Sequence, residues 1–235
     1  MRFRALATDY DGTLASNGEV AVPAWEALER LRASGRKAML VTGRELEDLK
    51  TVCPSLERFN RVVAENGALL YCPASGEEKV LAPPPPPTFI HALRDRGVAH
   101  LHSGRVIVAS VKPCETTILK TIRDMGLELQ VIFNKDAVMV LPSGVNKAVG
   151  LRAALAELGL SAKQVVGVGD AENDHAFLQE CGCSAAVADA VPALKEQADI
   201  VLAGGAGQGV TELIDQLLTD DLESICSKRC AARRD

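Results

Sequence analysis

The residues with the clearest chemical potential lie near the start of the chain, in the segment Asp9-Tyr10-Asp11-Gly12-Thr13-Leu14. The apolar run before it, residues 3–8, predicts a buried strand. Because residues i and i+2 of a strand point the same way, Asp9 and Asp11 are expected to face one pocket at the carboxyl end of that strand. Gly12 then allows a sharp turn. Two carboxylates placed in this way could carry out phosphoryl chemistry, although a strand followed by an Asp-Gly turn is common in proteins of any function.

A second polar segment, Gly169-Asp170-Ala171-Glu172-Asn173-Asp174, follows another predicted strand, residues 164–169. Asp and Asn are favoured at the start of a helix, which would account for one of these side chains. A hard divalent cation accounts for the whole set better, because Mg²⁺ takes oxygen ligands from a few carboxylates and keeps several waters. We therefore expect Asp170, Asn173 and Asp174 to belong to a magnesium site.

Two further segments supply groups suited to an anionic ligand. Thr42-Gly43-Arg44 follows the predicted strand 37–42 with a hydroxyl and with a glycine that frees backbone N–H groups for a phosphate oxygen. Lys147 opens a predicted helix, where the helix dipole disfavours a cation unless that cation faces an anionic site. Each signal is weak alone, but together they predict a phosphate-binding pocket.

The charges of these residues balance only when a metal ion is added. Ionised Asp9, Asp170 and Asp174 carry three negative charges, which one Mg²⁺ and the ammonium of Lys147 would neutralise. Without the cations, the three carboxylates would repel one another and raise one another's pKa. The sequence therefore predicts that the four side chains converge around a bound metal.

The composition excludes several classes of protein. The 235 residues carry a net charge of −5 and only 3% of them are aromatic, which argues against a nucleic-acid partner. No apolar run approaches the roughly 20 residues that a membrane span requires, so no membrane partner is expected. The seven cysteines form no recognisable small-domain disulfide framework, which favours reduced thiols and a cytoplasmic location.

Strand-like and helix-like segments alternate over most of the chain, which is typical of a parallel sheet with crossover helices. The predicted strands are residues 3–8, 37–42, 61–65, 164–169, 184–188 and 200–203, and the predicted helices residues 24–33, 147–158, 173–180 and 210–218. We therefore expect a doubly wound, Rossmann-like parallel α/β core formed by residues 1–82 and 146–235. The final residues, 220–235, are charged and are expected to be frayed.

A change of character at Pro83–Pro87 marks an inserted unit. Five consecutive prolines adopt stiff polyproline II geometry, so we interpret the run as a hinge; a site for a proline-recognising partner is the less favoured alternative. The insert has predicted helices at residues 88–96 and 115–125, a strand at 105–111, and a hairpin of residues 127–133 and 137–141 around Asn134-Lys135-Asp136. This order favours a small α+β cap domain over residues 83–145, with two helices on one face of its sheet.

The four motifs at Asp9, Thr42, Lys147 and Asp170, in this order, resemble the haloacid dehalogenase superfamily of phosphotransferases. The form Gly-Asp-x-x-Asn-Asp of the last motif, the segment Glu65-Asn66-Gly67-Ala68 and the position of the insert are similar to its Cof-type members with a type IIB cap. The resemblance covers nearly the whole chain. The short insert resembles small-cap phosphoglycolate phosphatases more than long-cap sugar phosphatases.

The resemblance implies a Mg²⁺-dependent hydrolase that acts on a small phosphorylated metabolite through an aspartyl-phosphate intermediate. It implies that Asp9 is the nucleophile and a metal ligand, and that Asp11 is the general acid/base with its backbone carbonyl on the metal. The remaining implied roles are phosphoryl binding by Thr42 and Lys147, support of the phosphate loop by Gly43 and Arg44, substrate binding by Asn66, and metal binding by Asp170 with Asn173 and Asp174 as ligands or their supports.

Several alternatives stay open at this point. The best substrate candidate is phosphoglycolate, with a sugar phosphate a close second, and the protein is expected to be a monomer or a homodimer. A phosphomutase could use the same core and cap. A non-catalytic phosphate-binding or regulatory protein is disfavoured, because binding alone would not need Asp11.

Four residues of the insert are candidates for substrate contacts. His100 and His102 alternate on an extended stretch and could share a face, but such a pair is more often an exposed loop. Arg105 and Lys112 are similar candidates for binding a carboxylate or second phosphate on the substrate.

In the core, Tyr10 is expected to face away from the site.

Overall fold

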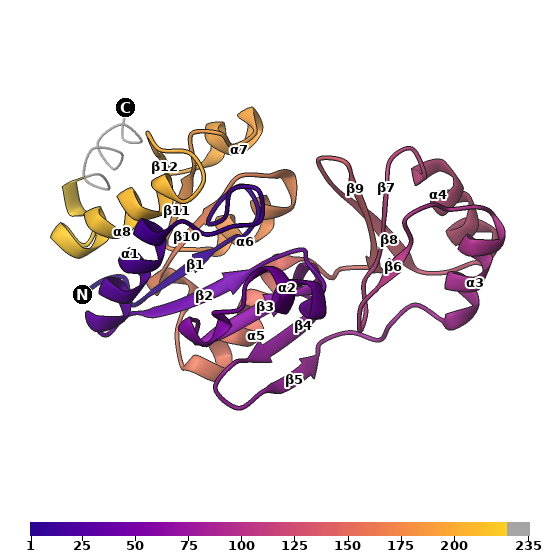
Figure 1. The fold of residues 1–235 in the computed structure, drawn as a ribbon, viewed down its shortest axis with the longest axis horizontal. Helices are drawn as coiled ribbons and strands as arrows, with labels where there is room; N and C mark the ends of the chain where they lie inside the picture. Colours follow the sequence, from indigo (N-terminus) through magenta and orange to yellow (C-terminus); the bar gives the residue numbers. More distant parts are fainter. Residues whose placement is uncertain (225–235) are drawn as a thin grey trace.

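The computed structural model describes residues 1–224 and has two lobes, each built on its own sheet (Figure 1). The larger sheet contains, in spatial order, β12 (Ile200–Val201), β11 (Cys183–Ala186), β10 (Val165–Gly169), β1 (Ala5–Thr8), β2 (Lys37–Val41), β3 (Arg61–Ala64), β4 (Leu69–Cys72) and β5 (Glu77–Val80). Strands β12 to β3 are parallel, and β4 and β5 add an antiparallel edge. The strand order reverses between β1 and β10, which confirms the doubly wound core and marks the place where such sheets bind ligands.

Helices cover both faces of this sheet, so its central strands are apolar throughout. All four residues of β1 and all five of β10 are buried, as expected for parallel strands covered on two sides. Helix α1 (Val22–Ala33) packs beside α8 (Gln208–Asp220), while α5 (Lys147–Leu158) packs beside α6 (His175–Glu180) and against β3. The shorter helices α2 (Leu46–Val52) and α7 (Pro192–Gln197) complete the lobe.

The smaller lobe is an antiparallel sheet with two helices on the face that points away from the larger lobe (Figure 1). Its strands are, in spatial order, β6 (His102–Ser103), β7 (Val108–Val111), β9 (Ala137–Pro142) and β8 (Leu129–Asn134), and its helices are α3 (Pro87–Asp95) and α4 (Glu115–Asp124). Val138 and Val140 pack with these helices, whereas Met139 and Leu141 join a separate cluster with Ala68 of the larger lobe. Because alternate residues of β9 point to opposite faces, one face of the small sheet packs on its own helices and the other packs on the larger lobe.

Two connections join the lobes. Pro83–Pro86 lie outside any helix or strand, with Pro86 in polyproline II geometry at φ −63° and ψ 145°, and Pro87 begins α3. The chain returns between the end of β9 and Lys147. The expected boundaries near residues 82 and 146 lie in these connections, and we propose to keep them as the limits of the cap domain.

Some elements differ from expectation. The hairpin of β4 and β5 was not predicted, and the predicted strand 105–111 is ordered as a strand only from Val108. The reason is that the backbone N–H groups of residues 105–107 donate to a carboxylate of the larger lobe instead of to a neighbouring strand. The start of the tail is not frayed: Leu222 is buried and Asp221 pairs with Arg36. Residues 225–235 lie outside the described part of the chain.

The close approach of α5 to the sheet predicts an unusual response at Gly150. A methyl group there would lie 2.2 Å from Cγ1 of Val63 and 2.8 Å from the Cα of Gly67. Helix propensity alone predicts that Gly150→Ala stabilises the fold by about 1 kcal/mol. We expect the overlap to outweigh this gain and to lower the free energy of unfolding by about 2 kcal/mol, measured by urea denaturation.

The control is Ala156→Gly, an exposed position on the same helix. It should cost about 1 kcal/mol through propensity alone. A stabilised Gly150→Ala protein would show that α5 is not held against β3 as described.

Candidate active site

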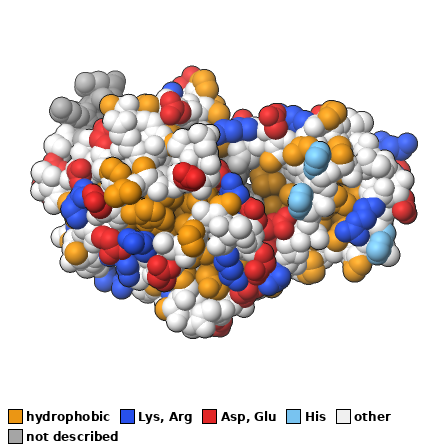
Figure 2. Space-filling view, viewed as in Figure 1, with side chains coloured by type: hydrophobic (Ala, Val, Ile, Leu, Met, Phe, Trp, Pro, Cys, Tyr) orange, Lys and Arg blue, Asp and Glu red, His pale blue; other side chains and the backbone are white. Residues whose placement is uncertain are grey.

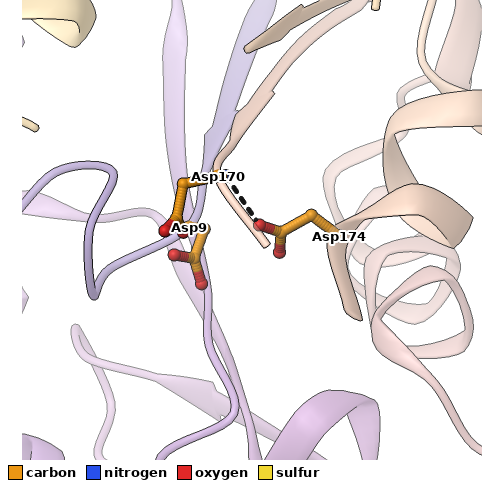
Figure 3. Close-up of side chains that lie close together, drawn as sticks. All are labelled: Asp9, Asp170 and Asp174. Carbon is orange, nitrogen blue, oxygen red and sulfur yellow. Dashed lines mark hydrogen bonds between the residues drawn. The ribbon is translucent and has the colours of Figure 1, made fainter. Parts of the chain in front are cut away.

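Three carboxylates meet at the carboxyl edge of the large sheet. Asp9 follows β1, Asp170 follows β10, and Asp174 ends the 3-10 turn Glu172–Asp174 that precedes α6. Because β1 and β10 are neighbours with Thr8 opposite Val168, the first two are delivered side by side. One oxygen from each of the three residues lies within 4.8 Å of the others, and all three side chains are buried (Figure 3). The predicted convergence of these side chains is therefore present.

Lys147 lies among these carboxylates and is itself completely buried. Its Nζ is 2.5 Å from Oδ1 of Asp9 and 2.5 Å from Oδ1 of Asp174. The preceding residue, Asn146, begins α5 by accepting hydrogen bonds from the N–H groups of residues 148 and 149, which fixes the first turn that carries the lysine. Burial lowers the pKa of Lys147, but Asp174 and Asp9 outweigh it and the pKa is raised, so the side chain is an ammonium ion.

One ammonium ion does not neutralise the cluster. Burial raises the pKa of Asp9 to about 8; Lys147 opposes this shift, and the charges of Asp174 and Asp170 add to it. Burial also raises the pKa of Asp170. The site therefore has the excess of buried negative charge that a divalent cation would relieve.

Asp174 also holds the loop that presents Asp170. Its Oδ2 accepts hydrogen bonds from the backbone N–H groups of Asp170 at 2.9 Å and Ala171 at 3.0 Å. Gly169 makes room for this arrangement, because a Cβ there would lie 2.6 Å from the same oxygen. Both oxygens of Asp174 thus have partners within the protein, and the residue acts at least as a support for the cluster.

The two asparagines predicted for the site are paired with each other. Nδ2 of Asn173 donates to Oδ1 of Asn66 at 3.0 Å, and both side chains are buried. Within the described residues, Oδ1 of Asn173 and Nδ2 of Asn66 have no hydrogen-bond partner. A buried, unpaired amide oxygen one residue from Asp174 suits a hard cation or its waters, so the residues present fit Mg²⁺.

Asp11 and Arg44 form a two-point ion pair at the edge of the site. Nε and Nη2 of Arg44 lie 2.6 Å and 2.8 Å from the two carboxylate oxygens of Asp11, and Nη1 binds Asp48. The backbone N–H of Arg44 donates to Oγ1 of the buried Thr42 at 3.1 Å. The guanidinium is therefore committed to carboxylates, while the hydroxyl of Thr42 holds the backbone that leads to Arg44. Tyr10 is buried and its hydroxyl donates to the backbone carbonyls of residues 18 and 52.

A cavity of about 550 Å³ opens between the two lobes above these residues. Figure 2 shows the hollow between the lobes, with histidine side chains on the side of the smaller lobe. The cavity is lined by Asp9, Asp11, Thr42, Gly43, Arg44, Glu45 and Asp48 from the core and by His100, His102, Ala109, Ser110, Val111, Asn134, Ala137 and Met139 from the insert. The insert thus forms one wall of the site, and both histidines belong to that wall.

The other two cations weighed in the insert have partners elsewhere. Arg105 pairs with Glu78 and Glu47, and Lys112 pairs with Asp136 at the hairpin. Neither lines the cavity between the lobes. They are surface ion pairs, which contribute little to stability.

Sequence reasoning missed Lys135, which lies at the tip of the β8–β9 hairpin. Its Nζ is 2.8 Å from Oδ2 of Asp170, so the insert contributes a cation directly to the cluster. The only signal in the sequence was a lysine between two turn-forming residues, and such a lysine is usually solvated.

Glu65 was also missed as a contact between the lobes. Its buried carboxylate accepts hydrogen bonds from the backbone N–H groups of Arg105, Val106 and Ile107 at 2.8, 2.7 and 2.9 Å. Glu65 and Asn66 both have positive φ, at 51° and 54°, a conformation that costs energy for residues other than glycine. The strained turn thus points one side chain to the insert and the next to Asn173.

The raised pKa of Asp9 predicts how stability changes with pH when no metal is present. Between about pH 4 and pH 8 the folded protein retains a proton on Asp9 that the unfolded chain releases, so stability falls as the pH rises. We expect the free energy of unfolding in EDTA to fall by roughly 5 kcal/mol more in the wild type than in Asp9→Asn over this range, because one proton is worth about 1.4 kcal/mol per pH unit.

Urea denaturation at the two ends of the range measures this difference. Addition of Mg²⁺ at the higher pH should stabilise the wild type and leave Asp9→Asn less affected. Equal pH slopes in the two proteins would contradict the assignment of the shift to Asp9.

The sequence is similar to that of known hydrolases over most of its length. Residues 6–85 and 111–214 match the family model of the haloacid dehalogenase-like hydrolases. A phosphoglycolate phosphatase of Methanothermobacter thermautotrophicus is 28% identical over 223 residues, which cover 92% of this chain and 99% of the relative.

Among the described residues, no helix combines the length and apolar character needed to cross a bilayer.

Solved structures share the fold. A haloacid dehalogenase-like hydrolase from Bacteroides thetaiotaomicron aligns with a TM-score of 0.76 at 19% identity, covering 92% of this chain and 99% of that one. A sugar phosphatase of subclass IIB of the same superfamily aligns with a TM-score of 0.73 at 18% identity, covering 91% and 98%. Both similarities extend over the core and the insert together.

Proposed function

We propose that this chain, which belongs to the haloacid dehalogenase-like hydrolases and is a phosphatase of that family, uses Mg²⁺ to hydrolyse a small organic phosphomonoester. The observation that carries the proposal is the buried cluster of Asp9, Asp170 and Asp174 around Lys147, from which Asp9 reaches the cavity between the two lobes. Asp9, the backbone carbonyl of Asp11 and Asp170 would hold the cation, with Asn173 and Asp174 in support. When bound, Mg²⁺ would neutralise charge on the phosphoryl oxygens.

Asp9 is the nucleophile in this proposal. An oxygen of its carboxylate forms a bond to phosphorus while the bond from phosphorus to the leaving oxygen breaks, which gives an aspartyl phosphate. A carboxylate needs no base to attack once it is ionised. Because burial raises the pKa of Asp9, positive charge beside it is needed at neutral pH, and Lys147 at 2.5 Å supplies part of it.

Asp11 moves the protons of both steps. In its protonated form it gives a proton to the leaving alkoxide in the first step. In the second step it accepts a proton from the water whose oxygen bonds to phosphorus, while the bond between phosphorus and the Asp9 oxygen breaks and inorganic phosphate is released. To do so it must separate from Arg44, to which it is now bound through both oxygens. The freed guanidinium would then lie beside the phosphoryl group, next to Thr42 and Gly43. Arg44 thus changes partner during the reaction.

The substrate proposal rests on the cavity and the relatives. Phosphoglycolate is supported by the phosphoglycolate phosphatase whose match covers 92% of this chain. A sugar phosphate is supported by the cavity of about 550 Å³ and by its polar wall of Glu45, His100 and His102, groups that hydrogen-bond to hydroxyls. A cytoplasmic location is part of the proposal, supported by the free thiols Cys53, Cys72, Cys114 and Cys181.

The central mechanistic prediction concerns Asp9. Asp9→Asn keeps a hydrogen-bond acceptor for Lys147 but removes the nucleophile, so we expect phosphate release to fall at least about a thousandfold while the circular dichroism spectrum is retained. The measurement is release of inorganic phosphate from p-nitrophenyl phosphate. Turnover near the wild-type rate would eliminate Asp9 as the nucleophile.

The class and substrate are tested with a panel of phosphomonoesters that includes phosphoglycolate and several sugar phosphates, each with Mg²⁺ and with EDTA. We expect metal-dependent phosphate release with one compound strongly preferred. Release that is unaffected by EDTA would refute the metal dependence. Isomerisation of a sugar phosphate without phosphate release would replace the hydrolase by a phosphomutase.

A further inference from the structure

The ion pair between Lys135 and Asp170 joins the two lobes at the active site. Lys135 belongs to the hairpin of the insert, and its Nζ lies 2.8 Å from Oδ2 of Asp170 in the core. Strand β8 of the same hairpin lies against the turn Glu172–Asp174. The contact is therefore part of how the insert rests on the carboxylate cluster.

Both oxygens of Asp170 have a partner in this arrangement. Its Oδ1 accepts a hydrogen bond from the hydroxyl of Thr13 at 3.2 Å, and its Oδ2 binds Lys135. Thr13 is completely buried in the core and has no freedom to leave. The side chain of Lys135 is 58% exposed, whereas that of Asp170 is 2% exposed, so the lysine is the partner that can be displaced.

The space beside Asp170 is also confined. A Cβ on Gly12 would lie 2.4 Å from Oδ2 of Asp170 and 2.9 Å from Nζ of Lys135, so the ammonium fits against bare backbone. Lys135 and Lys147 together neutralise two of the three negative charges of Asp9, Asp170 and Asp174. Lys135 thus takes part of the electrostatic role that the proposed function gives to a metal ion.

We propose that Lys135 and the divalent cation compete for Asp170, so that metal binding releases the hairpin of the insert from the core. The inference rests on the proposed function only in taking Asp170 as a metal ligand. By linkage, whatever holds the hairpin against the cluster weakens metal binding, and metal binding weakens that contact by the same factor.

The test is the affinity of the metal-free protein for Mg²⁺, measured by calorimetry without substrate. Lys135→Gln keeps the length of the side chain and removes its charge. The variant is expected to fold, because the residue is an exposed turn position. We expect Mg²⁺ to bind Lys135→Gln about fivefold more tightly than the wild type.

Lys112→Gln is the matched control. It removes one positive charge from the same lobe, but Lys112 faces Asp136 at 3.8 Å and does not reach the cluster. Its affinity for Mg²⁺ should stay within about twofold of wild type. An equal gain in both variants would overturn the proposal, because it would reflect net charge alone.

Unchanged or weaker Mg²⁺ binding by Lys135→Gln would also overturn the competition, whether or not the enzyme hydrolyses phosphomonoesters. The absence of turnover on every substrate, together with tighter Mg²⁺ binding by this variant, would refute the proposed function and retain the competition. The failure of each idea is thus visible separately.

Discussion

The structure depends on keeping three buried carboxylates close together. Charges that leave water without partners are strongly destabilising, and burial of Asp9 and Asp174 is tolerated because Lys147 lies between them. The surrounding elements position Lys147 and the three carboxylates. Neighbouring parallel strands deliver two of the aspartates, an asparagine cap fixes the lysine at the start of α5, and the absence of a side chain at Gly169 lets the third aspartate close on the loop. The side chains that are most costly to bury are therefore also the ones to which the proposed function assigns the chemistry.

The positions that sequence reasoning could place are those fixed by local rules. Asp9 and Asp170 were found because polar residues after buried strands collect at one edge of a parallel sheet, and Lys147 because a cation at a helix start is otherwise disfavoured. Lys135 and Glu65 could not be found in this way. Their partners lie 35 and about 40 residues away, on the other lobe, and depend on how the insert rests on the core. The fold class and insert were predictable from alternating segments, but the β4–β5 edge hairpin was not, because its strands are short and partly exposed.

Electrostatic pairing also explains why the site needs both lobes. In the core, Arg44 binds the two oxygens of Asp11, and the cluster retains an excess of negative charge. The insert supplies a wall of histidines and small apolar residues, together with one cation. The core alone lacks one wall of the cavity and one of the two cations that face the carboxylate cluster. The contact between Lys135 and Asp170, which joins the two lobes, is therefore part of the site.

The hydrogen bonds of Glu65 have a consequence for the modularity of the chain. A carboxylate of the core accepts three backbone N–H groups of the insert, and a side chain at Gly104 would overlap it, since a Cβ there lies 2.4 Å from Oε1. Deleting the insert would remove all three of these donors from Glu65 and expose its carboxylate to water. An insert grafted from a relative would keep the contact only if residues 104–107 were replaced by a segment with the same backbone path. Exchange of inserts between related proteins would thus be constrained by the contact between Glu65 and residues 105–107, to which the proposed function assigns no catalytic role. The unit to exchange would be the insert together with the segment that binds Glu65.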